Sequence, residues 1–246
     1  MSRKYKTSPI IEALCQFQFG PDTTWDLTIP GLVYEKVKNT FPNRNQVAQI
    51  NIGLAANAQI IGQQIGALPL MQFLSENGNT LMQVGQNLLT INQLNPYSSW
   101  EEFLPLIEQG LKAYEETAHP KNIQRIALQY LNRFEFENPI KLEDYLNFYP
   151  FLGKELPQDF GVFVVGVQIP FEDSFDLMNL QLTTVNSETP NTIAMILDLN
   201  YVLIKPENIT LVGALEWVDK AHKHVEDIFE ACITDQMRQR FQEVKE

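Results

Sequence analysis

Two short stretches with similar sequences carry the most suggestive set of polar side chains in the chain. Glu12 lies in the first stretch, and the second contributes Arg125, Tyr130, Asn132 and Arg133. A carboxylate, two guanidinium groups, a phenol and an amide can hold a polar ligand or form a buried ion pair. Because an unpaired buried charge is costly, we expect Glu12 to pair with Arg125 or Arg133.

Three interpretations of this set remain open. An ion pair there would be structural and would join two halves of the protein. A ligand or partner site would use the same seam between the halves. A catalytic carboxylate would need a second reactive group, and none accompanies Glu12 in the sequence. We therefore assign no catalytic residue and predict that the chain is not an enzyme.

Common catalytic and cofactor motifs are missing from the sequence. It contains no Gly-x-Ser-x-Gly, no P-loop, no Gly-x-Gly-x-x-Gly and no His-Glu-x-x-His. Of its three histidines, His222 and His224 are two residues apart on a predicted helix, so they point to different faces and would not chelate one metal ion. We predict no metal site and no cofactor.

Composition limits the classes of partner. The net charge of −12 disfavours direct nucleic-acid binding and favours a basic protein partner. The acidic residues are concentrated in positions 118–246, which hold 11 Lys and Arg against 20 Asp and Glu. Two cysteines do not make a disulfide framework, and neither a signal peptide nor a membrane span is recognisable. We expect a cytoplasmic protein that does not bind membranes.

A repeated pattern organises the chain. Leu14-Cys-Gln-Phe-Gln-Phe19 resembles Leu131-Asn-Arg-Phe-Glu-Phe136 at an offset of 117 residues, and the same offset superimposes Trp100 on Trp217. Alternation and turn signals predict strands at 14–19, 47–54, 68–74, 81–91, 123–136, 160–171, 177–185 and 193–204. Helical spacing and caps predict helices at 32–38, 100–119, 142–149 and 211–244.

These elements predict an α+β protein with an internal duplication. Residues 1–119 form the first β-α-β(3-4)-α unit, and residues 120–246 form the second, which ends in a long helix. Consecutive strands imply a mainly antiparallel sheet with the helices packed on one face. The two units would form one globular body with a pseudo-two-fold axis, and the order resembles the topology of TATA-binding-protein-like folds and effector-binding domains.

A closer resemblance covers essentially the whole chain. The start Pro9-Ile-Ile-Glu-Ala13 and the centre Arg125-Ile-Ala-Leu-Gln-Tyr-Leu-Asn-Arg-Phe134 are similar to the two signatures of a sporadically distributed family of prokaryotic proteins of about this length. That family is functionally uncharacterised, so the resemblance implies boundaries and no catalytic residue. Its patchy distribution implies a defence or toxin–antitoxin context.

Two functions follow as hypotheses. The first is a non-enzymatic, acidic protein-binding module, such as an antitoxin, immunity or regulatory subunit. Trp25, in the polar segment Asp22–Asp26, would then be an exposed anchor for the partner. The second is a small-molecule-binding domain or enzyme with its site at the seam between the repeats. In that case Glu12→Gln or Arg133→Ala would abolish stabilisation by the ligand.

Overall fold

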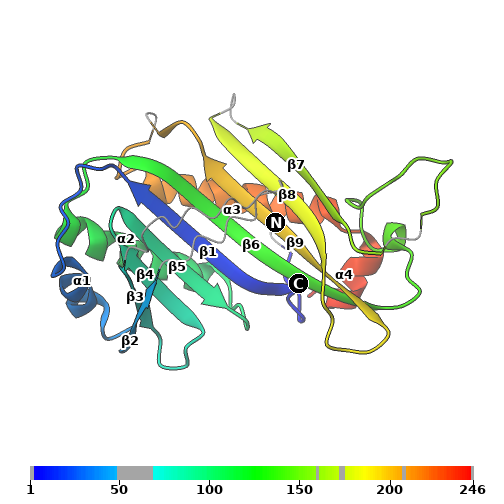
Figure 1. Cartoon of the computed structure of the whole chain (residues 1–246), viewed down its shortest axis with the longest axis horizontal. Helices are drawn as coiled ribbons and strands as arrows, with labels where there is room; N and C mark the ends of the chain where they lie inside the picture. The colour runs from blue at the N-terminus through cyan, green and yellow to red at the C-terminus, as the bar shows by residue number, and fades with distance from the viewer. Residues whose placement is uncertain (1–2, 49–68, 159–160, 172–174, 207–208, 245–246) are drawn as a thin grey trace.

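The described residues fold around one nine-stranded antiparallel sheet with four α-helices. The computed structural model describes residues 3–48, 69–158, 161–171, 175–206 and 209–244. The strand order is β2-β3-β4-β5-β1-β6-β9-β8-β7, so β1 and β6 lie side by side at the centre (Figure 1). The predicted α+β class and the antiparallel sheet are confirmed.

The elements follow one another in a similar order in the two halves. Residues 3–119 contain β1 (Ile10–Phe19), α1 (Ile29–Val37), β2 (Asn43–Ala48), β3 (Pro69–Leu74), β4 (Thr80–Gly85), β5 (Leu88–Leu94) and α2 (Trp100–Ala118). Residues 120–244 contain β6 (Ile123–Glu137), the 3-10 turn η1 (Leu142–Asp144), β7 (Val164–Phe171), β8 (Asp176–Val185), β9 (Thr192–Leu203), α3 (Ala214–Cys232) and α4 (Asp235–Phe241).

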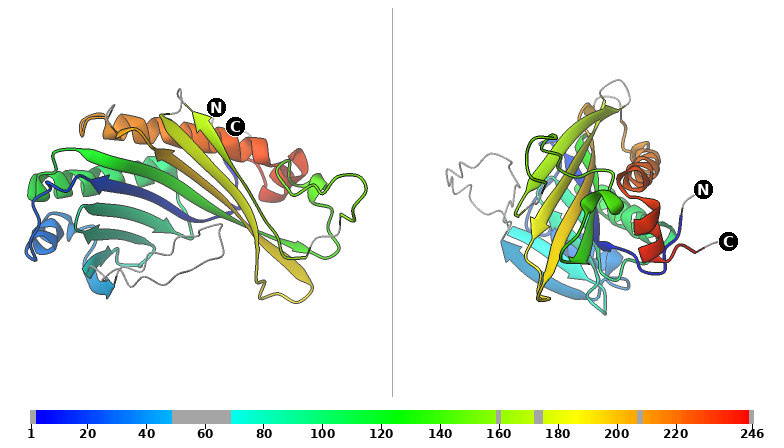
Figure 2. Two further views of the ribbon diagram at one scale, coloured as in Figure 1. Left: turned by 45° about the horizontal axis from the view of Figure 1, so that its top comes forward. Right: turned by 90° about the vertical axis from the view of Figure 1, so that its right-hand side faces the viewer.

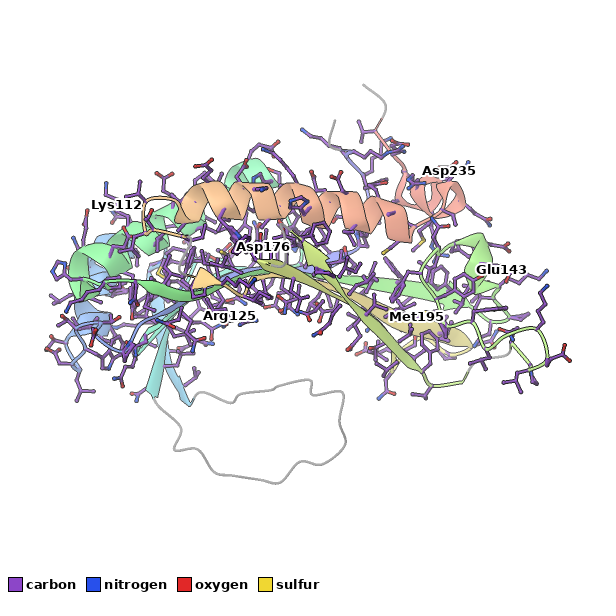
Figure 3. All side chains as sticks on the ribbon, turned by 90° about the horizontal axis from the view of Figure 1, so that it is seen from above. Lys112, Arg125, Glu143, Asp176, Met195 and Asp235 are labelled. Carbon is purple, nitrogen blue, oxygen red and sulfur yellow. The ribbon has the colours of Figure 1, made fainter. Side chains whose placement is uncertain are left out.

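Strand alternation decides which side chains meet the helices. In the β1–β6 pair, Cys15 lies opposite Leu128 and Phe17 opposite Ile126, and all four side chains are fully buried. Residues of all four helices join the same apolar cluster, including Val33, Phe103, Trp217 and Phe241. Helices therefore cover one face of the sheet, and at both ends the sheet bends away from them (Figures 2 and 3).

The prediction of a single helix at 211–244 is wrong, because this stretch forms two helices, α3 and α4. Ile233 is extended (φ −114°, ψ 154°) and pairs with Leu146, which ends α3. The hydroxyl of Thr234 then accepts a hydrogen bond from the Met237 amide and caps α4. The Thr234-Asp235 sequence is a start signal that the continuous amphipathic pattern conceals.

Three other predicted elements differ from the structure. The single strand predicted at 81–91 is two strands, β4 and β5, which pair with each other around a turn where Asn87 has a φ of 57°. Residues 142–149 form only the single turn η1 and an extended connection, because Leu146 pairs with Ile233 and the Asn147 amide donates to Cys232. The strand expected at 47–54 begins earlier, as β2, and its part beyond residue 48 lies outside the described residues. The strand predicted at 68–74 forms a hairpin with β4 around Asn77-Gly78, where Gly78 has a φ of 75°.

None of the described helices has both the length and the apolar character that a bilayer span requires.

Candidate functional site

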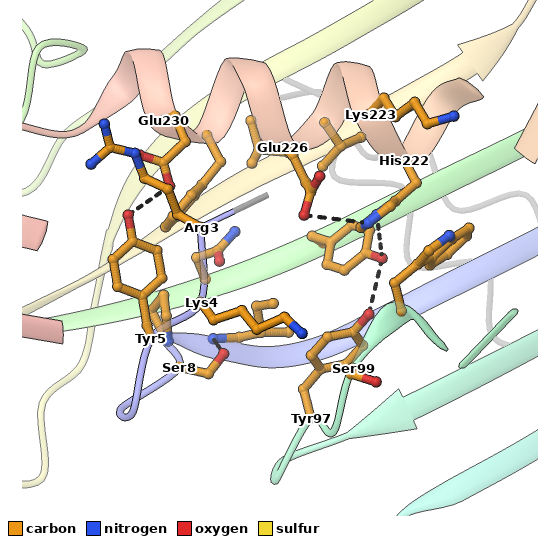
Figure 4. Close-up of a pocket in the computed structure, with 18 of the residues that line it drawn as sticks. Arg3, Lys4, Tyr5, Ser8, Tyr97, Ser99, His222, Lys223, Glu226 and Glu230 are labelled. Carbon is orange, nitrogen blue, oxygen red and sulfur yellow. Dashed lines mark hydrogen bonds and ion pairs between the residues drawn. The ribbon is translucent and has the colours of Figure 1, made fainter. Parts of the chain in front are cut away.

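An open cavity of about 1140 Å³ lies on the helix side of the sheet, where the two halves meet. We call it the seam cavity. Its walls are the N-terminus of α2, the middle of α3 and the segment from Arg3 to Ile10, and strand β6 contributes to its floor (Figure 4). Both halves therefore supply side chains to one space, as expected of a site at a domain seam.

Four side chains from three parts of the chain form a continuous row of polar contacts in the cavity. The Tyr97 hydroxyl lies 3.3 Å from the Tyr130 hydroxyl, which lies 3.2 Å from Nδ1 of His222. Nε2 of His222 lies 3.4 Å from a carboxylate oxygen of Glu226 (Figure 4). We call this row the seam relay.

Local structure places each member of the seam relay. Tyr130 follows Leu128 by two residues on β6, so it points to the helix side, and only 3% of it is exposed. His222 and Glu226 are four residues apart on α3 and therefore share one helix face. Tyr97 lies in the connection from β5 to α2, just before the Ser99 side chain caps α2 by accepting from the Glu102 amide.

At least one arrangement of protons satisfies the hydrogen-bond geometry. With the proton of His222 on Nε2, the ring donates to Glu226 and its Nδ1 accepts from the Tyr130 hydroxyl, which in turn accepts from Tyr97. Burial raises the pKa of both tyrosines, that of Tyr130 well above its ordinary value. Both phenols therefore remain protonated at neutral pH and act as hydrogen-bond donors.

An indole ring fixes the histidine from the other side. Trp100 stacks on His222 with ring centroids 4.0 Å apart and planes 12° apart. Its Nε1 donates to Asp219 over 3.1 Å, and Asp219 also pairs with Lys223 over 2.7 Å. Because the first turn of α2 and the middle of α3 are joined here, a shift between the two helices would disturb the relay.

The N-terminal segment forms the opposite wall and is tied to the C-terminal part of the chain. The Tyr5 hydroxyl donates to Glu230 over 2.6 Å, and Arg238 pairs with the same carboxylate over 2.8 Å. Backbone hydrogen bonds from Thr7 to Phe241 and from Val244 to Lys4 hold the segment along its length. The wall is thus built from contacts between residues more than 200 positions apart.

The seam cavity is acidic. Six carboxylates line it, against three lysine or arginine side chains. Each of the three cations already pairs with a lining carboxylate, in the pairs Arg3–Glu230, Lys4–Glu101 and Lys223–Asp219, and Arg3 also pairs with Glu243 over 3.0 Å. The other lining carboxylates are Glu102, Glu226 and Asp227. The cavity therefore has an excess of negative charge beside aromatic faces.

Two of the six residues predicted as candidate site residues line the seam cavity. They are Tyr130 and Asn132, and the amide of Asn132 also donates to the Leu197 carbonyl over 3.3 Å. Trp25 is half-buried and packs against the apolar core, whereas an exposed anchor was expected. Its burial follows from the bond between the Thr24 amide and the Ala118 carbonyl, which folds the loop onto the end of α2.

The charged candidates lie on the other face of the sheet, away from the described helices. Glu12 accepts a hydrogen bond from Asn92 over 2.6 Å, Arg125 donates to Gln16 over 3.1 Å, and Arg133 pairs with Glu135 over 2.6 Å. The expected pairing of Glu12 with an arginine is therefore replaced by contacts of each side chain with a residue on the same strand or on the neighbouring strand. The reason is register, since Glu12 lies opposite Leu131 and Leu94.

A half-buried acid on this face, Asp198, predicts a pH-dependent stability. Burial raises the pKa of Asp198, although a hydrogen bond from Gln129 over 2.7 Å opposes the shift. A raised pKa favours folding only while the group is protonated, so its contribution is complete below about pH 4 and is lost as pH rises through the folded-state value. We expect Asp198→Asn to increase the free energy of unfolding at pH 7, with a gain that shrinks towards zero near pH 4.

Urea unfolding of both proteins between pH 4 and pH 8 checks this expectation. The exposed acid Asp235 offers a matched control, because 89% of its side chain is accessible and Asp235→Asn should show no comparable gain at pH 7. A constant difference between Asp198→Asn and the native chain across the pH range would contradict the assigned role of Asp198.

Sequence reasoning misses Tyr97, Trp100, His222 and Glu226 as parts of one site. The helical spacing around Trp100 is typical of a core residue, and His222 stands out in the sequence only as a possible metal ligand. The His222–Glu226 spacing on one helix face is the available signal. Nothing in the sequence indicates that β6 presents Tyr130 to that face.

The described residues contain no cluster of three or more His, Cys, Asp or Glu side chains suited to a metal ion. Both cysteines are buried, and burial raises the pKa of Cys232 to about 12. The seam cavity is therefore equipped for hydrogen bonding, aromatic stacking and charge pairing.

Comparison with known proteins adds no family. No protein-family model matches the chain, and no curated protein matches it.

Proposed function

We propose that the protein binds a small cationic, aromatic molecule in the seam cavity and does so without catalysing a reaction. The observation that supports this proposal most directly is the composition of the lining, with six carboxylates against three lysine or arginine side chains. The proposal corresponds to the seam-site alternative that the sequence left open, with the site moved from Glu12 and the arginines to the helix side of the sheet.

Aromatic side chains in the cavity support the same ligand class. Tyr5, Tyr97, Trp100, Tyr130 and Phe229 all contribute to the lining. The faces of aromatic rings attract cations and stack on planar ligands, and a carboxylate near such a face strengthens the preference for positive charge. The volume of the seam cavity, about 1140 Å³, slightly exceeds the upper end of the usual range for ligand sites, which is about 300–1,000 Å³. A drug-sized molecule can therefore enter.

A matched series of indoles tests the preference for positive charge. We expect tryptamine to raise the melting temperature and to give a binding isotherm in calorimetry, with at least a tenfold weaker response to neutral 3-ethylindole and to anionic indole-3-propionate. Glu226→Gln should weaken tryptamine binding about tenfold, because it removes one negative charge beside His222. Equal binding of all three indoles, or no binding at millimolar concentration, would refute the proposal.

Glu12→Gln is the matched control, because it makes the same chemical change on the opposite face of the sheet. We expect tryptamine binding by this variant to equal that of the native chain. An equal loss in both variants would mean that the change in net charge, and not the seam cavity, decides the affinity.

A second candidate function is stoichiometric binding of a basic protein, as an antitoxin, immunity or regulatory subunit. The helix layer favours it, since α2 and α3 together carry ten carboxylates against three lysines. A pull-down at low and high salt distinguishes the two proposals. A basic protein captured in stoichiometric amount and released by salt supports this candidate, whereas its absence combined with tryptamine binding supports the first.

We further propose that the two halves derive from one duplicated unit with the pseudo-two-fold arrangement typical of TATA-binding-protein-like folds. The strand order supports this, because β1-β5-β4-β3 and β6-β9-β8-β7 each run outward from the centre. The paired indoles support it as well, since Trp100 and Trp217 each lie near the start of the long helix that follows the strands of their half, α2 and α3 respectively.

A further inference from the structure

Strand β7 forms one outer edge of the sheet, and among the described residues it pairs on one side only, with β8 (Figure 1). The Thr184 amide donates to the Phe163 carbonyl, which places Phe163 and every second residue after it in the ladder to β8. Val164, Gly166 and Gln168 therefore direct their amide and carbonyl groups away from the sheet. Pro170 belongs to the same alternating set of residues, whose backbone nitrogen atoms point away from β8. This is the expected place for proline, because it has no amide hydrogen to donate to the ladder.

The residues of this edge are unusually apolar and carry no charge. The stretch 161–171 has no Asp, Glu, Lys or Arg, although these make up 20% of the chain. The exposed fractions of Val162, Val164 and Val167 are 92%, 59% and 45%. Among the described residues, seven of the twelve exposed large apolar side chains lie between positions 151 and 175.

The opposite edge of the sheet is built differently. Strand β2 has the sequence Asn-Arg-Asn-Gln-Val-Ala, with a charge at Arg44 and three amides. Charged and polar side chains are the usual protection of a sheet edge against pairing with another chain. The contrast shows that β2 carries such protection and β7 does not.

From these observations we propose that β7 is a dimerisation strand, which pairs with β7 of a second copy of this chain to make one continuous antiparallel sheet. A two-fold axis through the pair Gly166–Gly166 satisfies every outward backbone group from Val164 to Gln168. Gly166 bonds to the partner's Gly166, and Val164 bonds to the partner's Gln168 in both directions.

The same register is self-complementary in its side chains. On the helix side it places Val165 beside the partner's Val167, and Phe163 beside the partner's Ile169, each pair occurring twice. On the free side Val164 meets the partner's Gln168. A contact in which one patch pairs with itself is the usual geometry of a two-fold dimer. Since the strand has no charge, the only electrostatic opposition comes from the net charge of −12 on each copy, and salt would weaken it.

Light scattering coupled to size exclusion tests the dimer, and Val167→Lys tests the strand. We expect the native chain to be a dimer at micromolar concentration, more tightly associated at high salt. Val167→Lys should raise the dissociation constant at least tenfold, because it places a charge beside the partner's Val165. Gln46→Lys on β2, an equal change of charge on the other edge, should leave the dissociation constant unchanged.

A cysteine at the two-fold axis identifies the register. In a hydrogen-bonded antiparallel pair the Cα atoms lie about 5.5 Å apart, within the range that a disulfide spans. We expect Gly166→Cys to form a disulfide-linked dimer on mild oxidation, while Gly31→Cys on the open surface of α1 does not. The native Cys15 and Cys232 are buried and do not compete.

A monomer at all accessible concentrations would overturn the proposed dimer, and so would a dimer that resists Val167→Lys and is not linked by Gly166→Cys. Tryptamine binding by a Val167→Lys monomer would leave the proposed ligand function intact, because β7 lies outside the seam cavity.

Discussion

Asp176→Ala should cost about 3–5 kcal/mol of the free energy of unfolding, the largest effect that we expect from any single polar substitution in this protein. The Asp176 carboxylate accepts from the Tyr201 hydroxyl and from Nε1 of Trp217, both over 3.0 Å. It is only 3% exposed and lies between the sheet and α3 (Figure 3). The substitution deprives two buried donors of this acceptor and leaves space where the carboxylate was.

Urea denaturation of Asp176→Ala measures the loss. The aspartate that accepts from the other indole offers the control, since Asp219 accepts from Nε1 of Trp100 and also pairs with Lys223. The Asp219 side chain is 40% exposed, so water can replace it, and Asp219→Ala should cost no more than about 1 kcal/mol. Similar losses in the two variants would show that burial does not distinguish these two indole–carboxylate pairs.

Tyr130→Phe should cost about 2–3 kcal/mol of stability and weaken tryptamine binding at least tenfold. The Tyr130 hydroxyl joins Tyr97 to His222, so its removal leaves both neighbours without this contact, and Tyr130 itself is only 3% exposed. The phenyl ring still fills the same volume. Any loss of affinity would therefore report the broken relay and the altered position of His222.

Tyr114→Phe is the matched control for the removal of one buried hydroxyl. The Tyr114 hydroxyl donates to the Gly85 carbonyl over 3.2 Å and lies outside the seam cavity. We expect Tyr114→Phe to lose about 1 kcal/mol of stability and to bind tryptamine as the native chain does. Calorimetry on both variants separates the two effects, and unchanged tryptamine affinity in Tyr130→Phe would remove the seam relay from the ligand site.

The proposed ligand site and the proposed dimerisation strand lie in different parts of the protein. The seam cavity lies on the helix side between the halves, whereas β7 lies at the outer border of the sheet. Ligand binding and self-association can therefore be tested independently.

Much of the fold could be predicted from the sequence because strand and helix periods are local properties. The alternation in Leu14–Phe19 and in Leu131–Phe136 identified two similar strands, and the structure places them side by side as β1 and β6. Ser98 and Ser99 before Trp100 predicted the start of α2, and the structure confirms the cap at Ser99. Each of these signals needs only a few neighbouring residues.

Register and long-range contacts lay beyond such reasoning. Whether Tyr130 faces helices and Glu12 the free surface depends on which side of the sheet the helices cover, and a shift of one residue would exchange the two faces. The extended residue Ile233 that divides α3 from α4 is held by Leu146, which is 87 positions away in the sequence.

The sequence by itself determined the α+β class, the antiparallel sheet, most strands and the acidic character, because composition and periodicity act locally. Only the tertiary structure brought Tyr97, Tyr130 and His222 together, since they come from a loop, a strand and a helix that are far apart in the chain. The same is true of the unpaired edge at β7, because a strand's place in the order of the sheet is decided by its neighbours and not by its own residues.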